Sequence, residues 1–222
     1  MLGSIDCMHW QWKNCPTAHK DFFVGHKRVP TIILEAVASQ DLWIWHSFFG
    51  LPGSHNDINV LHRSPVFANL AEGHAPEVNY TINGRNYNMR YYLADGIYPR
   101  WATFVKTIPN PTTEKNKHFA RCQEACRKDV ERAFRVLQAR FAIVRGPVRY
   151  WDLETLGEIM TACIILHNMI IEDERESHVD YRFQNMGELV TPSREEVATL
   201  TQFLQAHSAI RNKKFIVSVK LI

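Results

Sequence analysis

Short apolar runs separated by turn residues fill the first half of the chain, a pattern typical of β-strands. Residues 31–38 and 42–49 are rich in β-branched and aromatic side chains, and only Ser39, Gln40 and Asp41 separate them. Such a pair of runs predicts an antiparallel hairpin.

Two further extended patterns follow. Residues 78–82 and 85–89 flank an Asn-Gly pair, which is favoured in two-residue hairpin turns. Residues 91–94 are a short aromatic and apolar run that leads into Asp95, after which Gly and Pro break the run. We expect this run to be a buried strand that delivers the Asp95 carboxylate to the mouth of a sheet.

The chain opens on another strand pattern. Residues 3–10 are expected to contain the end of a strand, and Asp6 is expected to be its last residue. Residues 10–20 are expected to form a loop. A strand usually has about five to six residues, so the chain begins almost on its first structural element. A buried carboxylate is costly unless a cation meets it, so acids at strand ends indicate a metal, an arginine partner or a cap.

The second half of the chain follows helical periodicity. Residues 115–141 predict one long helix, and residues 153–171 predict a second, strongly apolar helix that is buried. Shorter helices are expected at residues 57–62, 100–106 and 192–207. The apolar positions of the long helix are Phe119, Cys122, Cys126, Val130, Ala133, Leu137 and Phe141.

Three residues with metal-binding side chains are interpreted as core residues. Cys122 and Cys126 are expected to be small residues of the core, and His167 a core histidine with satisfied hydrogen bonds. A zinc site near Cys7 and His9 is disfavoured, because the spacing of the nearby Cys and His residues fits no standard zinc motif.

The mixture of strands and helices in 222 residues indicates an α/β protein. We expect one domain at residues 1–176, and a linker, a short helix and a divergent tail at residues 177–222. No apolar run approaches the roughly 18 residues of a membrane span, so no membrane partner is expected. The start lacks a secretory signal pattern, and five unclustered cysteines fit a reducing compartment, which together indicate an intracellular protein.

Charge is unevenly distributed along the chain. Residues 115–149 contain ten Lys or Arg against three acids, whereas residues 150–196 contain three Arg against eleven acids. The basic segment is compatible with a polyanionic partner. A solvated helix face is an equally good interpretation of the same segment.

Three acids occupy positions from which they could share a metal site. Asp6 and Asp95 are expected at strand ends, and Glu131 lies midway along the long helix, with Arg127 and Arg135 one turn away on its face. Carboxylates are the hard ligands that Mg²⁺ and Mn²⁺ prefer, and a metal pair held by them activates water or a 3′-hydroxyl. Taken singly, the three acids are better explained as a strand-end cap, a turn former and an ion-pair partner, and only their combination favours a metal site.

Five blocks of sequence resemble a known family. Residues 4–10, 53–57, 93–101, 129–134 and 137–147 are similar to the signature blocks of the PIF/Harbinger family of DDE transposases and of nucleases derived from them. The last block has the form seen in plant members, and the resemblance extends from about residue 3 to residue 174.

The resemblance implies a fold and a chemistry. The fold would be a ribonuclease-H-like mixed sheet flanked by helices, with Asp6, Asp95 and Glu131 as the catalytic DDE triad. Asp57 falls at a further acidic position of the family and would be a fourth carboxylate of the metal site, or a first-turn acid that interacts with the helix dipole.

Members of the family act in the nucleus. They cut and join DNA with Mg²⁺ or Mn²⁺ and work with a separate Myb-like DNA-binding partner. We therefore expect a nuclear location, with the cytoplasm as an alternative.

Three departures from the family pattern bear on activity. The family has a region before the first catalytic strand that is missing here, Arg135 replaces a usual glycine, and residues 211–222 do not resemble the family's C-terminal end. We therefore expect a truncated copy of the transposase.

Two functions are consistent with these observations. The first is a metal-dependent nuclease acting on DNA phosphodiester bonds. The alternative is a domesticated, catalytically inactive module for protein interaction or chromatin association. In the first, phosphate contacts that carry no sequence information would come from the basic helix, through Arg127, Lys128, Arg132, Arg135 and Arg140.

Overall fold

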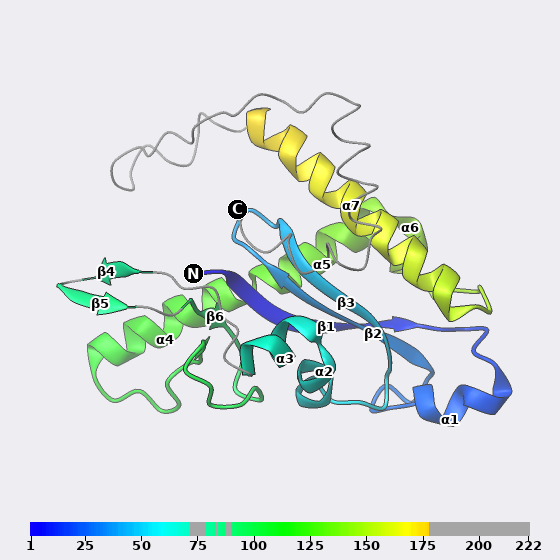
Figure 1. Ribbon diagram of the computed structural model, residues 1–222, viewed down its shortest axis with the longest axis horizontal. Helices are drawn as coiled ribbons and strands as arrows, with labels where there is room; N and C mark the ends of the chain where they lie inside the picture. The colour runs from blue at the N-terminus through cyan, green and yellow to red at the C-terminus, as the bar shows by residue number, and fades with distance from the viewer. Residues whose placement is uncertain (72–78, 83, 88–89, 178–222) are drawn as a thin grey trace. The chain divides into compact units, whose positions relative to one another are not determined.

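A five-stranded mixed sheet lies at the centre of the part of the chain that is described. The computed structural model describes residues 1–71, 79–82, 84–87 and 90–177, all within the unit Met1–Val179. The order of the strands is β3-β2-β1-β6-β7 (Figure 1). The predicted linker, last helix and tail lie outside the described residues.

The predicted hairpins are confirmed. β1 (Gly3–Gln11), β2 (Thr31–Ala38) and β3 (Ile44–Pro52) form an antiparallel meander. A separate two-stranded sheet consists of β4 (Tyr80–Ile82) and β5 (Arg85–Tyr87).

The other edge of β1 carries two short parallel strands. β6 (Tyr92–Leu93) pairs with Gly3 and Ser4 of β1, and β7 (Phe104–Val105) pairs with β6. β6 confirms the strand expected at residues 91–94. The helix expected at residues 100–106 is wrong, because Phe104 and Val105 extend the sheet as β7 and bury the Phe104 ring against Tyr98.

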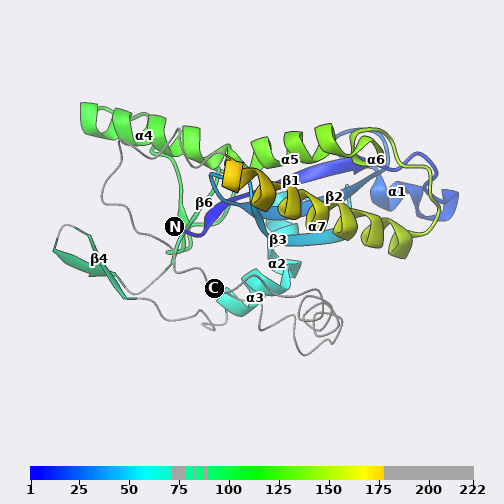
Figure 2. The ribbon, with the colours of Figure 1, turned by 90° about the horizontal axis from the view of Figure 1, so that it is seen from above.

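Helices cover both faces of the sheet (Figure 2). α5 and α7 share a core on one face of the sheet, and Figure 2 shows α2 and α3 on the side away from α5. The helical elements are η1 (Thr17–His19), α1 (Lys20–Phe23), α2 (Asp57–Arg63), α3 (Pro65–Ala71), α4 (Glu114–Arg127), α5 (Asp129–Arg140), α6 (Ala142–Arg145) and α7 (Leu153–Ser177).

Because successive side chains of a strand point to opposite faces, the sheet contributes residues to two hydrophobic cores. Met8 and Trp10 of β1 pack in one core with Val130 and Leu137 of α5 and Met160 of α7.

The second core is smaller and lies on the opposite face. Ile5 of β1 and Val37 of β2 pack there with Leu61, Phe67 and Tyr98. β2 therefore has no solvent-exposed face, and all of its residues are buried.

The long helix predicted at residues 115–141 is two helices. α4 and α5 meet at Lys128, where φ is −78° and ψ is 0°. α4 buries only Gln123 of its residues, whereas α5 buries five. The break allows α5 to follow the sheet while α4 continues beyond it, as Figure 2 shows.

The break also explains why two core assignments are wrong. Cys122 and Cys126 are exposed, and Phe119 is 39% exposed. The apolar spacing continued across Lys128, but α4 turns Gln123 toward the short strand β7 and leaves Cys122 and Cys126 exposed.

α7 is the strongly apolar helix that the periodicity predicted. It buries Met160 and His167 against the sheet, but Leu166 and Met169 on its other face are exposed. His167 is a satisfied core residue as predicted, since its Nε2 lies 2.9 Å from the Leu42 carbonyl oxygen.

By length and composition alone, α7 has a stretch that could cross a membrane. This stretch is Leu153–Arg175, with a mean hydropathy of 1.3 over its most apolar window. A core helix that packs on a sheet, as this one does, has the same length and composition.

The α/β class is confirmed. A mixed five-stranded sheet with helices on both faces is compatible with the ribonuclease-H-like fold that the sequence blocks implied. Its antiparallel meander and the two parallel strands added at β1 place the middle of β1 next to the end of β6.

Candidate active site

Asp6 lies within β1, and the prediction that it ends the strand is wrong. β1 continues to Gln11, because Met8 and Trp10 fill the core beneath α5 while Cys7 and His9 face the other side. β6 pairs with β1 only at Gly3 and Ser4. Asp6 therefore lies close to the end of β6, although it is in the middle of its own strand, β1.

Asp95 follows the end of β6 in a tight turn. Its Oδ1 accepts a hydrogen bond of 2.9 Å from the Ile97 amide, the turn-forming role anticipated for an Asp before Gly. Lys106 closes the turn by donating its Nζ protons to the carbonyl oxygens of Gly96 and Tyr98, at 2.9 and 2.7 Å.

Gln123 of α4 fixes the approach to this turn. Its Nε2 donates to the Ala94 carbonyl oxygen at 3.1 Å and to the Val105 carbonyl oxygen at 3.0 Å. The side chain is 4% exposed. Gln123 thus ties α4 to the backbone just before Asp95, which gives the otherwise weakly packed helix a role in positioning this carboxylate.

Glu131 is on the first turn of α5, on the side of the helix that faces β1. Its side chain is 30% exposed. Oε1 lies 3.3 Å from Arg127 and Oε2 lies 3.9 Å from Arg135. The carboxylate is thus an ion-pair partner of both arginines, and it also borders the pocket described below.

Asp57 is the first residue of α2, on the opposite side of β1 from Glu131. Asn56 is the N-cap, because its side chain accepts a hydrogen bond from the Asn59 amide. Burial raises the pKa of Asp57, and the neighbouring Asp95 carboxylate raises it further, while a hydrogen bond with Cys7 opposes this shift.

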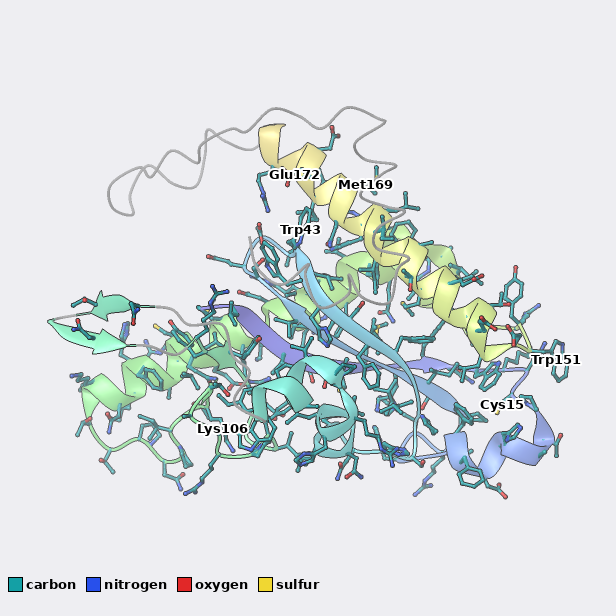
Figure 3. All side chains as sticks on the ribbon, in the orientation of Figure 1. Cys15, Trp43, Lys106, Trp151, Met169 and Glu172 are labelled. Carbon is teal, nitrogen blue, oxygen red and sulfur yellow. The ribbon has the colours of Figure 1, made fainter. Side chains whose placement is uncertain are left out.

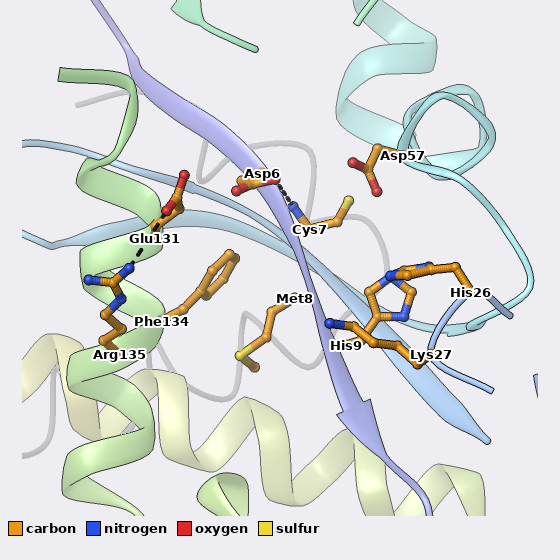
Figure 4. A pocket seen from close by; sticks show the side chains of 10 residues that line it. All are labelled: Asp6, Cys7, Met8, His9, His26, Lys27, Asp57, Glu131, Phe134 and Arg135. Atoms are coloured by element: carbon orange, nitrogen blue, oxygen red, sulfur yellow. Dashed lines mark hydrogen bonds and ion pairs between the residues drawn. The ribbon is translucent and has the colours of Figure 1, made fainter. Parts of the chain in front are cut away.

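One pocket brings three of the four predicted acids together. Asp6, Asp57 and Glu131 line a pocket of about 530 Å³ along the middle of β1 (Figure 4). Asp95 does not line it, but its charge acts on both Asp6 and Asp57. β1, α2, α5 and the turn after β6 therefore place one carboxylate each around this part of the sheet.

The electrostatics of the pocket are dominated by Asp6. Burial raises its pKa to about 7, and the charges of Asp57, Glu131 and Asp95 act in the same direction. The hydrogen bond of 2.8 Å that Oδ1 accepts from the Cys7 amide opposes this shift. A cation bound beside Asp6 would stabilise the ionised form of this carboxyl group.

The donors suit a hard divalent metal, but they are not gathered around a ready-made site. Within the described residues, no three Asp, Glu, His or Cys side chains lie close enough together to hold a metal ion. Carboxylate oxygens fit Mg²⁺ or Mn²⁺. Holding an ion would require Glu131 to exchange its arginine contacts for it.

The five basic residues expected to meet nucleic acid are in different surroundings. Lys128 is exposed at the helix break, and the side chain of Arg135 is 77% exposed beside the pocket. Arg127 pairs with Glu124 as well as with Glu131.

The remaining two basic residues are bound by acids of the protein. Arg132 pairs with the buried Asp129. Arg140 pairs with Glu174 of α7, its NH1 lies 3.4 Å from Nδ1 of His167, and its side chain is only 19% exposed. Arg140 thus joins α5 to α7.

The sequence interpretation missed the basic side of the pocket. His9, His26 and Lys27 line it on the same side of β1 as Asp57, away from Glu131 (Figure 4). Strand alternation places His9 on the same face as Cys7, so a longer β1 would have revealed it. His26 and Lys27 lie in the loop before β2, where no periodicity indicates which way a side chain points.

The fold and the set of acids around β1 define an α/β protein of the transposase-related, ribonuclease-H-like class. The chain belongs to the plant transposon protein family, which matches residues 1–178. The resemblance to Harbinger-type transposases is thereby confirmed.

One curated relative is the Arabidopsis thaliana protein named "Protein ALP1-like". It is 27% identical over 184 residues, which make up 79% of this chain and 44% of the relative. The chain therefore spans less than half the length of that relative. No solved structure matches the chain.

Proposed function

We propose that this protein is a divalent-metal-dependent nuclease that acts on DNA phosphodiester bonds. The observation that carries the proposal is the convergence of Asp6, Asp57 and Glu131 on one pocket, with the charge of Asp95 acting on Asp6 and Asp57. These residues come from four separate elements. Membership of a transposase family supports the same chemistry.

Asp6, Asp95 and Glu131 have the catalytic roles in this proposal, and Asp57 is a fourth metal ligand. Mg²⁺ or Mn²⁺ would supply a polarised water or 3′-hydroxyl and would stabilise the leaving oxygen. Lys106 and Gln123 hold the turn that carries Asp95, and Arg127 and Arg135 hold Glu131 at the mouth of the pocket.

DNA is the proposed substrate, bound through its phosphates by Lys128, Arg135 and their neighbours. A nuclear location and a Myb-like DNA-binding partner belong to the same proposal. The partner would supply sequence selectivity, because contacts to phosphate carry no sequence information.

A specific observation favours the second function, an inactive interaction module. Glu131 is engaged by two arginines, and Arg135 stands where the family usually has glycine. An arginine at this position stabilises the carboxylate without a metal, which would suit a protein that retains the fold but has lost catalysis.

Metal binding separates the two functions. We expect isothermal titration calorimetry to detect Mn²⁺ binding by the folded chain at micromolar concentrations, and Asp95→Asn and Glu131→Gln each to abolish it. Asp173→Asn, at an exposed position of α7, is the matched control and is expected to bind as the unchanged chain does.

The binding result decides whether a nicking assay on DNA should follow. If the folded chain takes up no Mn²⁺, the nuclease proposal is wrong and the interaction module remains. Binding that survives both substitutions would place the metal elsewhere in the protein.

A further inference from the structure

The pocket along β1 is lined by two chemically different groups of side chains. Asp6 and Glu131 supply oxygen atoms at one end, and His9, His26 and Lys27 supply nitrogen atoms at the other, which we call the basic end, with Asp57 beside His26 (Figure 4). An enzyme that cuts a polyanion with a metal has a use for both, because its substrate carries a row of phosphates. The basic end has no assigned role in the proposed chemistry.

His9 is held in a fixed orientation. Its Nδ1 lies 3.0 Å from the Thr31 hydroxyl oxygen, and the ring meets that of His26 edge-on with 4.8 Å between centroids. Because Nδ1 is engaged with Thr31, Nε2 is the ring nitrogen left for a ligand. The half-buried imidazole therefore forms a rigid wall of the pocket.

His26 and Lys27 add two exposed side chains to this end of the pocket. Both side chains are exposed in the loop that leads into β2, and both border the pocket. Their charges reach His9, since burial first and then His26 and Lys27 lower the pKa of the His9 imidazole to about 4. The loop thus brings the Lys27 ammonium group to this end of the pocket, near a His9 imidazole that is uncharged at neutral pH.

The edge of β1 is open where these side chains gather. β6 covers Gly3 and Ser4, and Val148 bridges to Trp12, so the described strands leave the edge between them unpaired. A ligand can therefore approach the backbone of β1 as well as the side chains. The pocket volume of about 530 Å³ lies within the range of small-molecule sites.

The basic end already contains a cationic side chain, Lys27, which would repel a metal ion bound beside it. An ammonium group beside two imidazoles instead suits an oxyanion, to which lysine is a common ligand.

We propose that His9, His26 and Lys27 form a phosphate subsite, which holds the DNA phosphate next to the one that is cut at the carboxylates. The inference rests on the proposed nuclease function. It adds a direction for the substrate strand, which runs along the open edge of β1 from the acids toward the loop before β2. Lys27 and His26 would bind the phosphate oxygens, and the His9 imidazole would form a wall of the subsite.

Binding of a fluorescent single-stranded oligonucleotide in EDTA tests the subsite without cleavage and without metal. Anisotropy titrations compare the unchanged chain with Lys27→Ala and His26→Ala. Lys20→Ala is the matched control, because Lys20 is an exposed lysine of the neighbouring helix α1 that does not border the pocket.

We expect Lys27→Ala to weaken binding about tenfold or more, as the loss of a charged hydrogen bond does. Lys20→Ala should change affinity by less than about twofold. Equal affinities of the two lysine variants would overturn the proposal. Because Lys27 and Lys20 are both exposed, misfolding would not account for a difference between them.

Inorganic phosphate provides a second, independent readout. In NMR spectra of the histidine ring protons, added phosphate should shift the His9 and His26 signals and leave exposed His19 unchanged. Shifts of all three, or of none, would contradict a localised subsite. Phosphate shifts together with unchanged oligonucleotide binding by Lys27→Ala would show that DNA is not the ligand, and would overturn the proposal.

The subsite and the nuclease can fail separately. Loss of oligonucleotide binding in Lys27→Ala, in a chain that takes up no Mn²⁺, would support the subsite and reject the nuclease. Nicking by Lys27→Ala with unchanged KM and kcat would reject the subsite and leave the nuclease standing.

Discussion

Burial of single polar side chains sets the response of this protein to pH. The clearest case is Asp6, whose carboxyl group is surrounded by protein and by other acids, so that its pKa rises from 3.8 to about 7. Asp57 shifts in the same direction for the same first reason, burial. Both groups keep their protons in the folded, metal-free protein under conditions in which the unfolded chain has released them.

The first prediction concerns the metal-free protein. Between pH 3.8 and about 7 the folded chain binds more protons at Asp6 than the unfolded chain does, so the free energy of unfolding falls as the pH rises through this window. Above the window, the contribution of Asp6 is constant. Asp6→Asn should flatten this dependence and stabilise the fold at pH 8 in EDTA.

Urea unfolding at pH 5 and pH 8 measures this effect. Asp173→Asn, exposed on α7, should retain the pH dependence of the unchanged chain. An Asp6→Asn profile parallel to that of the control would contradict the assignment of the shift to Asp6.

Glu35 is a second buried acid, and His46 is its close polar neighbour. It is 0% exposed, its Oε1 lies 3.3 Å from Nε2 of His46, and its Oε2 has no hydrogen-bond partner within the described part of the chain. His46 also contacts the Ser64 hydroxyl at 3.1 Å. The sequence pattern predicted β2 as a strand of a hairpin, but not that its Glu35 carboxylate is buried.

The second prediction is that His46→Leu destabilises the protein by about 1–3 kcal/mol, because it leaves the buried Glu35 carboxyl group without this hydrogen-bond partner. The double variant Glu35→Leu with His46→Leu should recover most of this loss, since neither polar group then remains. Urea denaturation of both variants provides the comparison. A single variant that is as stable as the double variant would show that the pair is not coupled.

Each helix depends differently on the sheet. α5 buries five residues and packs on β1 and β2, whereas α4 is attached through Gln123 at its C-terminal half. α7 pairs with the edge strand β3 in another way, because the Asn168 side chain accepts from the Ile44 amide at 2.9 Å and donates to the Ile44 carbonyl oxygen at 2.8 Å. The Asn168 side-chain amide thereby pairs with backbone groups that would otherwise be unpaired at the start of an edge strand.

The third prediction separates the two faces of α7. Met160 is fully buried, whereas Met169 is 51% exposed and lies on the outer side of the helix in Figure 3. Met160→Ala should reduce the free energy of unfolding by about 2–5 kcal/mol, and Met169→Ala should change it by less than about 0.5 kcal/mol. Equal losses in urea denaturation would contradict the packing of α7 on the sheet.

At the scale of the whole molecule, the net charge of +3 hides an uneven surface. Several of the basic side chains near the pocket are neutralised by neighbouring acids, while others remain exposed. Lys128 and Arg140 illustrate the difference, since the first is exposed at the break between α4 and α5 and the second is held between Glu174 and His167.

The fourth prediction follows for DNA binding. Lys128→Ala should reduce the slope of log affinity against log salt concentration by about 0.7–0.9, the value for one lost phosphate contact. Arg140→Ala should leave the slope unchanged and lower the stability instead. Titrations at several salt concentrations measure the slope, and a reduced slope for Arg140→Ala with unchanged stability would reverse the assignment.

Local sequence patterns were sufficient for most of the strands and for the class of the fold. The hairpin of β2 and β3 follows from β-branched runs around a short turn, and α7 follows from its periodicity. The break at Lys128 and the strand β7 could not be predicted, because each depends on where the sheet ends. The exposure of Cys122 and Cys126 has the same cause.

The sequence by itself determined the α/β class, the transposase family and the four acids, because these depend on residue types and spacings along the chain. Only the tertiary structure decided that Asp6 lies within β1, beside the end of β6, and that His9, His26 and Lys27 line the same pocket as three of the acids. The physical reason is that strand pairing and loop direction are set by contacts between distant segments. Contacts of the same kind join Arg140 to Glu174 of α7, and Gln123 to the backbone just before Asp95.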